Sequence, residues 1–264
     1  MKLKPEFNRF NAFIFDCDGT LWIGENPIPG ALEAVEKLRE LGKIVLYATN
    51  NSTLSRKGYL AKVRKLGFTA KIQEIYCSSY VAAMLMKNLG LRDVFPLGEK
   101  GLIEELMKVG LRVLDIESDE TAEGVLVGLD RRLTYRKLQY AFRHILKGAL
   151  FIATNKDPTL PMEDGFTPGA GAIVAALETA LGRSVDILVG KPSPYLFIEA
   201  MKEWKLDSSE VLVIGDRLDT DIEGARRARL ASALVATGVT QPAEISLSKV
   251  KPSYVLSTLL EIFE

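Results

Sequence analysis

The feature that most constrains the fold of this chain is a short apolar run that ends in two acids. Residues 12–15 read Ala-Phe-Ile-Phe, and Asp16, Cys17, Asp18 and Gly19 follow directly. A run of this length without polar alternation is typical of a strand buried on both faces, as in a parallel sheet. Open α/β sheets bind their ligands at the carboxyl ends of such strands. The two acids are therefore expected at a ligand-binding edge.

Asp16 and Asp18 are two residues apart in extended backbone, so their carboxylates point to the same side of the strand. Two close negative charges are unfavourable unless a proton or a cation lies between them. Because Mg²⁺ prefers hard oxygen ligands, the pair predicts a magnesium site. The pattern Asp-x-Asp alone is a weak signal, since Asp219 and Asp221 repeat it. The apolar run before the first pair and Gly19 after it give that copy its weight.

The chain around this strand alternates apolar runs and helical patterns with short connections. Further strands are predicted at 44–48, 74–77, 187–189, 211–214, 233–236 and 254–256, and helices at 32–38, 59–66, 79–88 and 197–204. This alternation is the signature of a doubly wound parallel sheet. We therefore predict an α/β fold whose core is a doubly wound, Rossmann-like parallel sheet.

A second α/β unit interrupts this pattern before the first sheet resumes. Its strands are predicted at 94–97, 113–116, 125–129 and 150–153, and its helices at 102–109, 135–146 and 172–181. Because these segments restart the strand–helix order with apolar runs of their own, they predict a separate core. The predicted domains are a core domain of residues 1–89 and 186–264 and an inserted α/β cap domain of residues 90–185.

Composition excludes several classes of function. The chain of 264 residues has 34 basic and 34 acidic side chains, so no net charge argues for nucleic acid or an anionic membrane. No apolar run approaches the roughly 20 residues that cross a bilayer, and a cytoplasmic location is expected. With His144, Cys17 and Cys77 as the only residues of their kinds, a zinc site or a Ser-His-Asp triad is hard to assemble. His144 is predicted at the surface, and the cysteines as buried small hydrophobes.

Polar residues follow four of the predicted core strands. They are Asp16 and Asp18, Thr49 and Asn50, Lys191, and Asp216 with Asp219 and Asp221. Because the carboxyl ends of parallel strands lie along one edge, these residues should converge. Phosphoryl transfer needs a nucleophile, a metal ion, hydroxyl or amide donors and a cation, and this edge offers each of them.

In these motifs the chain resembles the haloacid-dehalogenase superfamily of phosphohydrolases. The motifs are Asp16–Thr20, Thr49 in Thr-Asn-Asn-Ser, Lys191 in Gly-Lys-Pro-Ser-Pro, and Gly215–Asp221, in the family's order. Their fuller forms are similar to subclass IIA, the branch that holds nitrophenylphosphatases and phosphoglycolate phosphatases. That branch inserts an α/β cap between the second and third motifs, where the sequence places the second unit. The resemblance covers essentially the whole chain.

The resemblance implies a role for each motif residue. Asp16 would be the nucleophile that forms an aspartyl-phosphate, and Asp18 would protonate the leaving oxygen and later accept a proton from water. Mg²⁺ would be held by the carboxylates of Asp16 and Asp216 and by the backbone carbonyl of Asp18. The phosphate would be bound by Thr49, Asn50, Asn51 and Lys191, with Asp221 orienting the groups around it.

The segment Thr154-Asn155-Lys156-Asp157 repeats the Thr-Asn of the second motif within the inserted domain. In relatives the corresponding cap loop faces the active site, so Asn155 and Asp157 are candidate substrate contacts. Residues 155–161 include no aromatic side chain that could stack on a heteroaromatic substrate. We therefore expect a small phosphorylated metabolite, such as phosphoglycolate or a short sugar phosphate, rather than pyridoxal phosphate or a nucleotide.

Two other functions use similar residues. A receiver module also places Asp, Thr and Lys at strand ends around Mg²⁺, but it has no inserted cap, and its phosphoacceptor does not lie in a first-strand Asp-x-Asp. A phosphotransferase or phosphomutase is the nearer alternative, although well-known mutases of this superfamily place their cap between the first and second motifs. The expected partner is thus a small metabolite, with neither nucleic acid nor membrane. A homodimer through the cap stays open.

Overall fold

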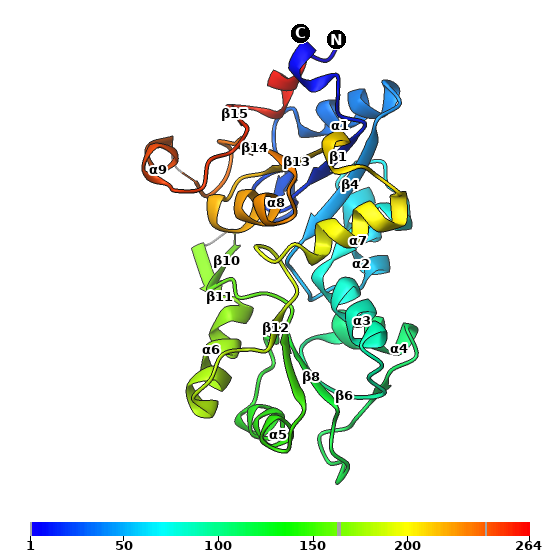
Figure 1. Ribbon diagram of the computed structural model, residues 1–264, viewed down its shortest axis with the longest axis vertical. Helices are drawn as coiled ribbons and strands as arrows, with labels where there is room; N and C mark the ends of the chain where they lie inside the picture. Colours follow the sequence, from blue (N-terminus) through cyan, green and yellow to red (C-terminus); the bar gives the residue numbers. More distant parts are fainter. Residues whose placement is uncertain (1, 163–164, 241) are drawn as a thin grey trace. The chain divides into compact units, whose positions relative to one another are not determined.

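The computed structural model describes residues 2–162, 165–240 and 242–264, and Figure 1 shows the path of the chain. The chain divides into two compact units. Unit 1 comprises Met1–Thr49, Leu60–Tyr76 and Lys191–Glu264, and unit 2 comprises Asn50–Tyr59 and Cys77–Gly190. Each unit contains a sheet of its own with helices packed against it.

The sheet of unit 1 has six strands within the described residues, in the order β15-β14-β13-β1-β4-β5. Their bounds are β1 (Ala12–Phe15), β4 (Ile44–Thr49), β5 (Ile75–Cys77), β13 (Val211–Gly215), β14 (Ala231–Val235) and β15 (Tyr254–Leu256). Strand β1 lies between β13 and β4 and pairs in parallel with both. All of its residues are buried, as its uninterrupted apolar run predicts. The predicted α/β fold class is confirmed.

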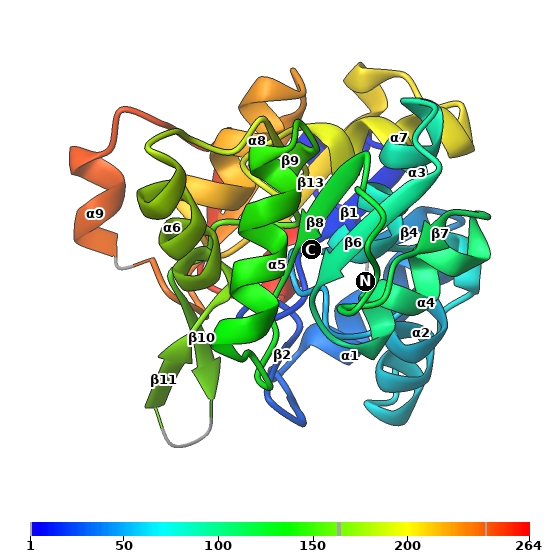
Figure 2. The ribbon, with the colours of Figure 1, turned by 90° about the horizontal axis from the view of Figure 1, so that it is seen from below.

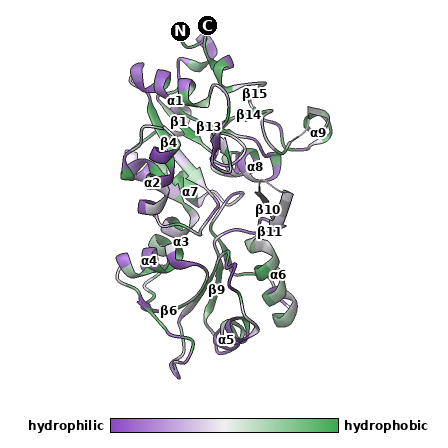
Figure 3. Ribbon diagram, turned by 180° about the vertical axis from the view of Figure 1, so that it is seen from behind, coloured by the Kyte–Doolittle hydropathy of each residue, from purple (hydrophilic) through white to green (hydrophobic). Residues whose placement is uncertain are grey.

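Helices in unit 1 follow the strands as the strand–helix alternation predicts. They are α1 (Ala31–Glu40), α7 (Tyr195–Trp204), α8 (Glu223–Arg227) and α9 (Pro242–Leu247), while α2 (Arg56–Lys65) contributes residues to both units. Short helical turns cover Pro5–Phe7, Ile72–Glu74, Ser208–Glu210 and Leu259–Ile262, and Leu218–Ile222 forms a π-helical segment. Helix α2 is largely hydrophilic in Figure 3, yet it buries Tyr59 and Val63.

The sheet of unit 2 is also parallel, with the order β12-β9-β8-β6-β7. Its strands are β6 (Asp93–Leu97), β7 (Arg112–Val113), β8 (Gly124–Val127), β9 (Leu150–Ala153) and β12 (Ile187–Leu188). The helices of this unit are α3 (Ser78–Asn88), α4 (Lys100–Lys108), α5 (Tyr135–Leu146) and α6 (Ala170–Leu181). The predicted strands and helices of the inserted unit are thus found, with shifts of a few residues at their ends. The strand predicted at 187–189 was assigned to the sheet of the core domain, and that assignment was wrong, because β12 pairs in parallel with β9 in the sheet of unit 2.

Alternation along β8 shows which helices cover which face of this sheet (Figure 2). Val125 and Val127 belong to a buried cluster with side chains of α5 and α6. On the other face, a Cβ added at Gly124 would lie 2.9 Å from the terminal methyl of Met86 in α3. The side chain of Met86 in α3 therefore packs directly over Gly124, and α3 covers this face of the sheet.

Two antiparallel hairpins were not predicted. They are formed by β2 (Trp22–Ile23) with β3 (Asn26–Pro27), and by β10 (Thr159–Met162) with β11 (Gly165–Pro168). The sequence predicted loops there, because strands of two to four residues that include proline carry almost no periodic signal.

The compact units divide the chain differently from the predicted domains, which ended at residues 89 and 185. Helix α3, assigned to the core domain by its place after β5, packs on α4 in unit 2. Its residue Ser79 donates a hydrogen bond to the carbonyl of Leu54, 3.0 Å away in the same unit. Order along the chain alone did not reveal this packing.

The prediction for His144 was wrong. The side chain is 4% exposed, with its ring centroid 4.9 Å from that of Phe95. Its Nδ1 accepts a hydrogen bond of 3.2 Å from the backbone N–H of Ala122. Residues from neighbouring elements cover a position that the helical pattern alone placed beside the apolar stripe. Cys17 and Cys77 are buried free thiols, as predicted. Within the residues described, no helix has the length and apolarity to cross a membrane.

Candidate active site

Three carboxylates from separate segments of unit 1 meet at one edge of its sheet. Asp16 follows β1 and Asp216 follows β13, and the register pairs Phe15 with Ile214 in these neighbouring strands. The two acids therefore leave the sheet side by side. Asp221 joins them from the π-helical segment, and an oxygen of each carboxylate lies within 4.8 Å of the others.

Burial and mutual repulsion make this cluster unfavourable without added positive charge. Asp216 and Asp221 are almost wholly buried, and the side chain of Asp16 is 12% exposed. Burial raises the pKa of Asp16 well above its ordinary value, with Lys191 opposing and Asp221 and Asp216 adding to the rise. Burial, then the charge of Asp221, raises the pKa of Asp216 to about 6. A cluster of this kind holds a tightly bound proton or a cation.

Lys191 supplies a cation within unit 1. Its side chain is 2% exposed, and it forms ion pairs with Asp16 and, at 2.7 Å, with Oδ1 of Asp221. Its ammonium also donates to the carbonyl of Ala48 at 3.1 Å. Burial alone would lower the pKa of Lys191, but the charges of Asp16 and Asp221 outweigh it and raise that pKa. One ammonium thus faces three carboxylates and leaves an excess of negative charge.

The backbone closes tightly around Asp216. A Cβ at Gly19, where φ is +92°, would lie 2.6 Å from one carboxylate oxygen of Asp216, and a Cβ at Gly238 only 2.0 Å from it. The N–H of Val239 donates to that oxygen at 2.7 Å, and Thr20 Oγ1 lies 3.4 Å from the other. The glycines leave space that only the carboxylate occupies, so the orientation of Asp216 is fixed by the chain itself.

The donor set fits a hard divalent cation. Asp16 and Asp216 place carboxylate oxygens close together, and these are the ligands that Mg²⁺ prefers. The pKa of each carboxyl group is raised by burial, so a bound cation would stabilise the ionised forms. Asp221 belongs to the same cluster, and its predicted orienting role stays a prediction. Its Oδ2 accepts the N–H of Arg217 at 3.1 Å, which leaves Oδ1 to face Lys191. The predicted ligand role of the Asp18 carbonyl stays a prediction.

Asp18 has two partners that sequence reasoning missed. The indole N–H of Trp22 donates to Oδ1 of Asp18 at 2.9 Å, and the ammonium of Lys62 lies 3.6 Å from the same oxygen. Trp22 lies four residues after Asp18 in a hairpin that was not predicted. Lys62 comes from α2, and nothing in its sequence context connects it with Asp18.

The phosphate-binding residues expected after β4 lie at the division between the units. Thr49 ends β4 in unit 1 and is 2% exposed, while Asn50 and Asn51 belong to unit 2. The side-chain amide of Asn50 donates to both oxygens of Asp157, at 3.1 and 3.3 Å. The side-chain oxygen of Asn51 accepts hydrogen bonds from the N–H and the hydroxyl of Thr53 at 3.0 and 2.8 Å.

Asn155 and Asp157 are held in unit 2 by hydrogen bonds to the chain around Asn50. Asn155 is 3% exposed; its amide donates to the carbonyl of Asn50 at 2.7 Å, and its oxygen accepts the N–H of Asp157 at 3.1 Å. In unit 2 both side chains hydrogen-bond Asn50, the residue after Thr49. Their predicted contact with substrate stays a prediction. Asp219, which the sequence analysis left out of the site, is largely exposed and pairs with Arg217 at 2.8 Å.

A parallel α/β core with buried aspartates and a lysine beside its strand ends is the arrangement expected of a haloacid-dehalogenase phosphohydrolase. Comparison with known proteins agrees with this class of protein. Residues 13–112 match the family of haloacid dehalogenase-like hydrolases, and residues 188–262 match the HAD-hydrolase-like family. The chain is 37% identical to 4-nitrophenylphosphatase of Schizosaccharomyces pombe, over 99% of this chain and 96% of that protein. The chain belongs to the haloacid-dehalogenase-like hydrolases.

Other relatives carry names of the same kind. Phosphoglycolate phosphatase 2 of Arabidopsis thaliana is 36% identical, over 99% of this chain and 95% of that protein. The crystal structure of 4-nitrophenylphosphatase from Thermotoga maritima matches with a TM-score of 0.89 and 33% identity, covering 96% of both chains. Glycerol phosphate phosphatase from Mycobacterium tuberculosis in complex with magnesium matches with a TM-score of 0.92 and 35% identity, covering all of this chain and 79% of that one.

Proposed function

We propose that this chain is a Mg²⁺-dependent phosphatase that hydrolyses small phosphomonoesters through an aspartyl-phosphate at Asp16. The observation that carries the proposal is the buried cluster of Asp16, Asp216 and Asp221 around Lys191, in which negative charge exceeds positive charge. The relatives named as phosphatases support the same class of reaction.

The carboxylates of Asp16 and Asp216, with the backbone carbonyl of Asp18, would hold Mg²⁺. When bound, the ion would offset the repulsion between a carboxylate nucleophile and a phosphate dianion and stabilise negative charge in the transition state. Lys191 contributes the fixed positive charge of the chain itself. Because its ammonium bonds Asp16 and pairs with Asp221, it also holds the nucleophile in one orientation.

In the first half-reaction a carboxylate oxygen of Asp16 attacks phosphorus, a P–O bond to the carboxylate forms, and the P–O bond to the leaving group breaks. Protonated Asp18 gives its proton to the departing oxygen, so that an alcohol leaves rather than an alkoxide. In the second half-reaction water attacks the phosphorus of the aspartyl-phosphate. Asp18, now ionised, takes the proton from that water, and Asp16 and inorganic phosphate are released.

The substrate proposed is a small aliphatic phosphomonoester, with phosphoglycolate and short sugar phosphates preferred over pyridoxal phosphate and nucleotides. The proposal is supported by the absence of an aromatic side chain between residues 155 and 161 of the sequence. The relatives named for phosphoglycolate and glycerol phosphate are consistent with small substrates. Comparison of kcat/KM across such a panel tests this preference, and a clear preference for pyridoxal phosphate would contradict it.

The covalent step can be tested by trapping the adduct. After rapid acid quench during turnover, reduction with borohydride should convert phosphorylated Asp16 to homoserine, which peptide mass spectrometry locates at residue 16. The adduct should form with Mg²⁺ and fail to form in excess chelator. Turnover without a trappable adduct at Asp16 would contradict the proposal, and transfer of the phosphoryl group to an added alcohol instead of water would favour a phosphotransferase.

A further inference from the structure

The side chain of Asp18 is anchored through one of its two oxygens. Trp22 donates its indole N–H to Oδ1 at 2.9 Å, and the ammonium of Lys62 lies 3.6 Å from that same atom. Within the part of the chain that the structure describes, Oδ2 of Asp18 accepts no hydrogen bond from protein. The two oxygens of a carboxylate that is proposed to move protons are therefore not equivalent.

Trp22 is itself held firmly by the chain around it. Its side chain is wholly buried, and its ring centroid lies 5.8 Å from that of Phe68. The backbone N–H of Gly19 donates to the carbonyl of Trp22 at 2.8 Å, which closes the turn between Asp18 and the indole. A donor buried in this way has little freedom, so it can fix the rotation of the carboxylate that it bonds.

Lys62 completes the arrangement from helix α2. Its ammonium lies over the ring of Trp22, 5.2 Å from the centroid, and its side chain is only 19% exposed. The contact with the indole face places the cation beside Asp18 rather than in solvent. Lys62 and Trp22 thus act on the same oxygen from two different elements.

We propose that Trp22 and Lys62 are positioning residues that anchor Oδ1 of Asp18 and leave Oδ2 to carry the proton in both half-reactions. The inference rests on the proposed function, in which Asp18 is the general acid and base. Neither residue touches the reacting phosphate in this account. Their effect is therefore confined to steps that need proton transfer by Asp18.

The experiment uses variants that keep packing and remove only the polar contact. Trp22→Phe keeps an aromatic ring against Phe68, and Lys62→Met keeps the apolar stem over the indole. The chain offers matched controls: Trp204→Phe removes the other indole N–H, which bonds the carbonyl of Gln73 at 3.3 Å. Lys65→Met removes an exposed ammonium from α2 that pairs with Glu25.

Two substrates separate proton transfer from phosphoryl transfer. Nitrophenolate leaves without protonation, whereas the alkoxide of phosphoglycolate requires it. The ratio kcat/KM reports the steps up to release of the leaving group. For phosphoglycolate, Trp22→Phe and Lys62→Met should each lower kcat/KM about tenfold or more, which is within the range of general acid catalysis. For nitrophenyl phosphate the loss should be less than about twofold. The pre-steady-state burst of nitrophenolate should persist while the following steady-state rate falls, because only the second half-reaction needs the base.

The outcomes are distinct. Lys62→Arg should recover most of the loss, and both controls should match the wild-type protein. Equal losses of kcat/KM for the two substrates, or no loss for either, would overturn the positioning role, as would a loss of the burst itself in a folded variant. Absence of the Asp16 adduct in the wild-type protein is a different result, which overturns the proposed function and this inference with it.

Discussion

The strand tips of the two sheets make opposite use of charged side chains. In unit 1, Asp16, Asp216 and Asp221 share the single ammonium of Lys191, and burial raises the pKa of Asp16 and Asp216. In unit 2, Glu99 follows β6, and its carboxylate accepts two hydrogen bonds from the guanidinium of Arg131, at 2.6 and 2.7 Å. Those hydrogen bonds lower the pKa of Glu99. The same kind of sheet edge therefore holds unbalanced charge in one unit and balanced charge in the other.

The second pair in unit 2 follows the same rule. Asp130, 4% exposed, accepts from Lys137 at 2.7 Å and from the N–H of Arg132 at 2.9 Å. Glu99 and Asp130 each have a base of their own, so these two charges need no external ion. Balance of this kind indicates a structural role, whereas the excess of carboxylates in unit 1 supports the proposed site for a cation and a phosphate.

The largest expected effect is that of Asp16→Asn. The amide keeps the shape of the side chain but removes the nucleophile, so kcat should fall by at least about a thousandfold with the fold intact. Glu99→Gln, a matched change of acid to amide at the edge of unit 2, should leave kcat within about twofold. Steady-state kinetics measures kcat of the two variants, and circular dichroism checks that each is folded. Comparable losses of kcat in the two variants would contradict the difference in role between the two sheet edges.

Lysines that pair with buried carboxylates in the two units give a second contrast. Lys191→Met should lower kcat/KM by about a hundredfold or more, because the phosphoryl group and Asp16 lose their fixed cation. Lys137→Met should instead lower the free energy of unfolding by about 1–3 kcal/mol, since it leaves the Asp130 carboxylate buried without its ammonium, and should leave kcat/KM nearly unchanged. Chemical denaturation measures the free energy of unfolding of both variants, and steady-state kinetics measures their kcat/KM. The reverse pattern would show that the roles of the pairs are misassigned.

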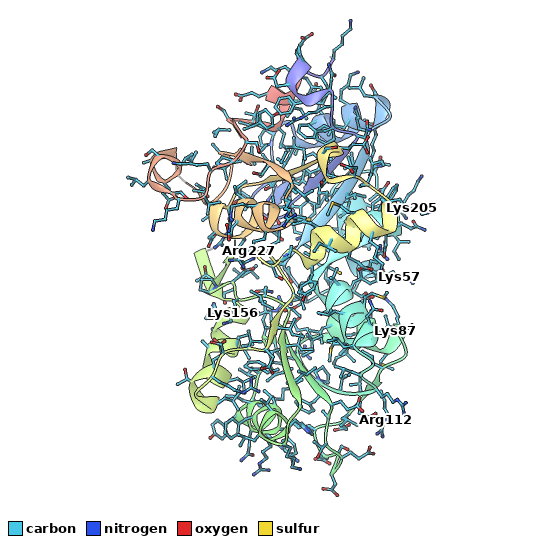
Figure 4. All side chains as sticks on the ribbon, viewed as in Figure 1. Lys57, Lys87, Arg112, Lys156, Lys205 and Arg227 are labelled. Carbon is cyan, nitrogen blue, oxygen red and sulfur yellow. The ribbon has the colours of Figure 1, made fainter. Side chains whose placement is uncertain are left out.

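Asp157→Ala tests what the loop of unit 2 does for phosphate binding. Because Asp157 accepts two hydrogen bonds from the side chain of Asn50, next to Thr49, we expect a three- to tenfold loss of kcat/KM, of about the same size for phosphoglycolate and nitrophenyl phosphate. Lys156→Ala is the control in the same loop, labelled in Figure 4, since its ammonium pairs with Glu178 at 2.6 Å. A loss confined to one substrate would instead support the direct contact that the sequence predicts.

The smallest effect concerns His144 in unit 2. Burial, and then the charge of Lys147, lower the pKa of His144 below its ordinary value. The unfolded chain therefore binds more protons than the folded one below about pH 6.5, so this contribution to stability is present above that pH and is lost as the pH falls through the folded pKa. Between pH 7.5 and 5.5, Tm of the wild-type protein should fall roughly 1–3 °C further than that of His144→Gln. Parallel curves for the two proteins would contradict the prediction.

Much of the core could be predicted from the sequence because its signals are local. The apolar run before Asp16 identifies a doubly buried strand, and a parallel sheet brings the ends of its strands to one edge. That reasoning placed Asp16 and Asp216 together. It does not account for Lys191, because the strand before this lysine, β12, belongs to the sheet of unit 2. The roles of Asn50, Asn51 and the Asp18 carbonyl stay predictions.

The features that were missed depend on contacts between distant segments. Lys62 reaches Asp18 only because α2 packs where it does, and its surroundings in the sequence are those of a solvent-exposed lysine. His144 lies beside the apolar stripe of α5, but Phe95 and Ala122 from other elements cover it. Periodicity describes one element at a time, so it cannot report what another element covers.

The central claim is that the excess of carboxylates in unit 1 binds a divalent cation, whereas the balanced acids of unit 2 bind none. Isothermal calorimetry with Mg²⁺ tests it directly, on the wild-type protein, Asp216→Asn and Glu99→Gln. The account predicts one Mg²⁺ site in the wild-type protein, loss of that site in Asp216→Asn and its retention in Glu99→Gln. Absence of binding to the wild-type protein, or binding that survives in Asp216→Asn and disappears in Glu99→Gln, would contradict it.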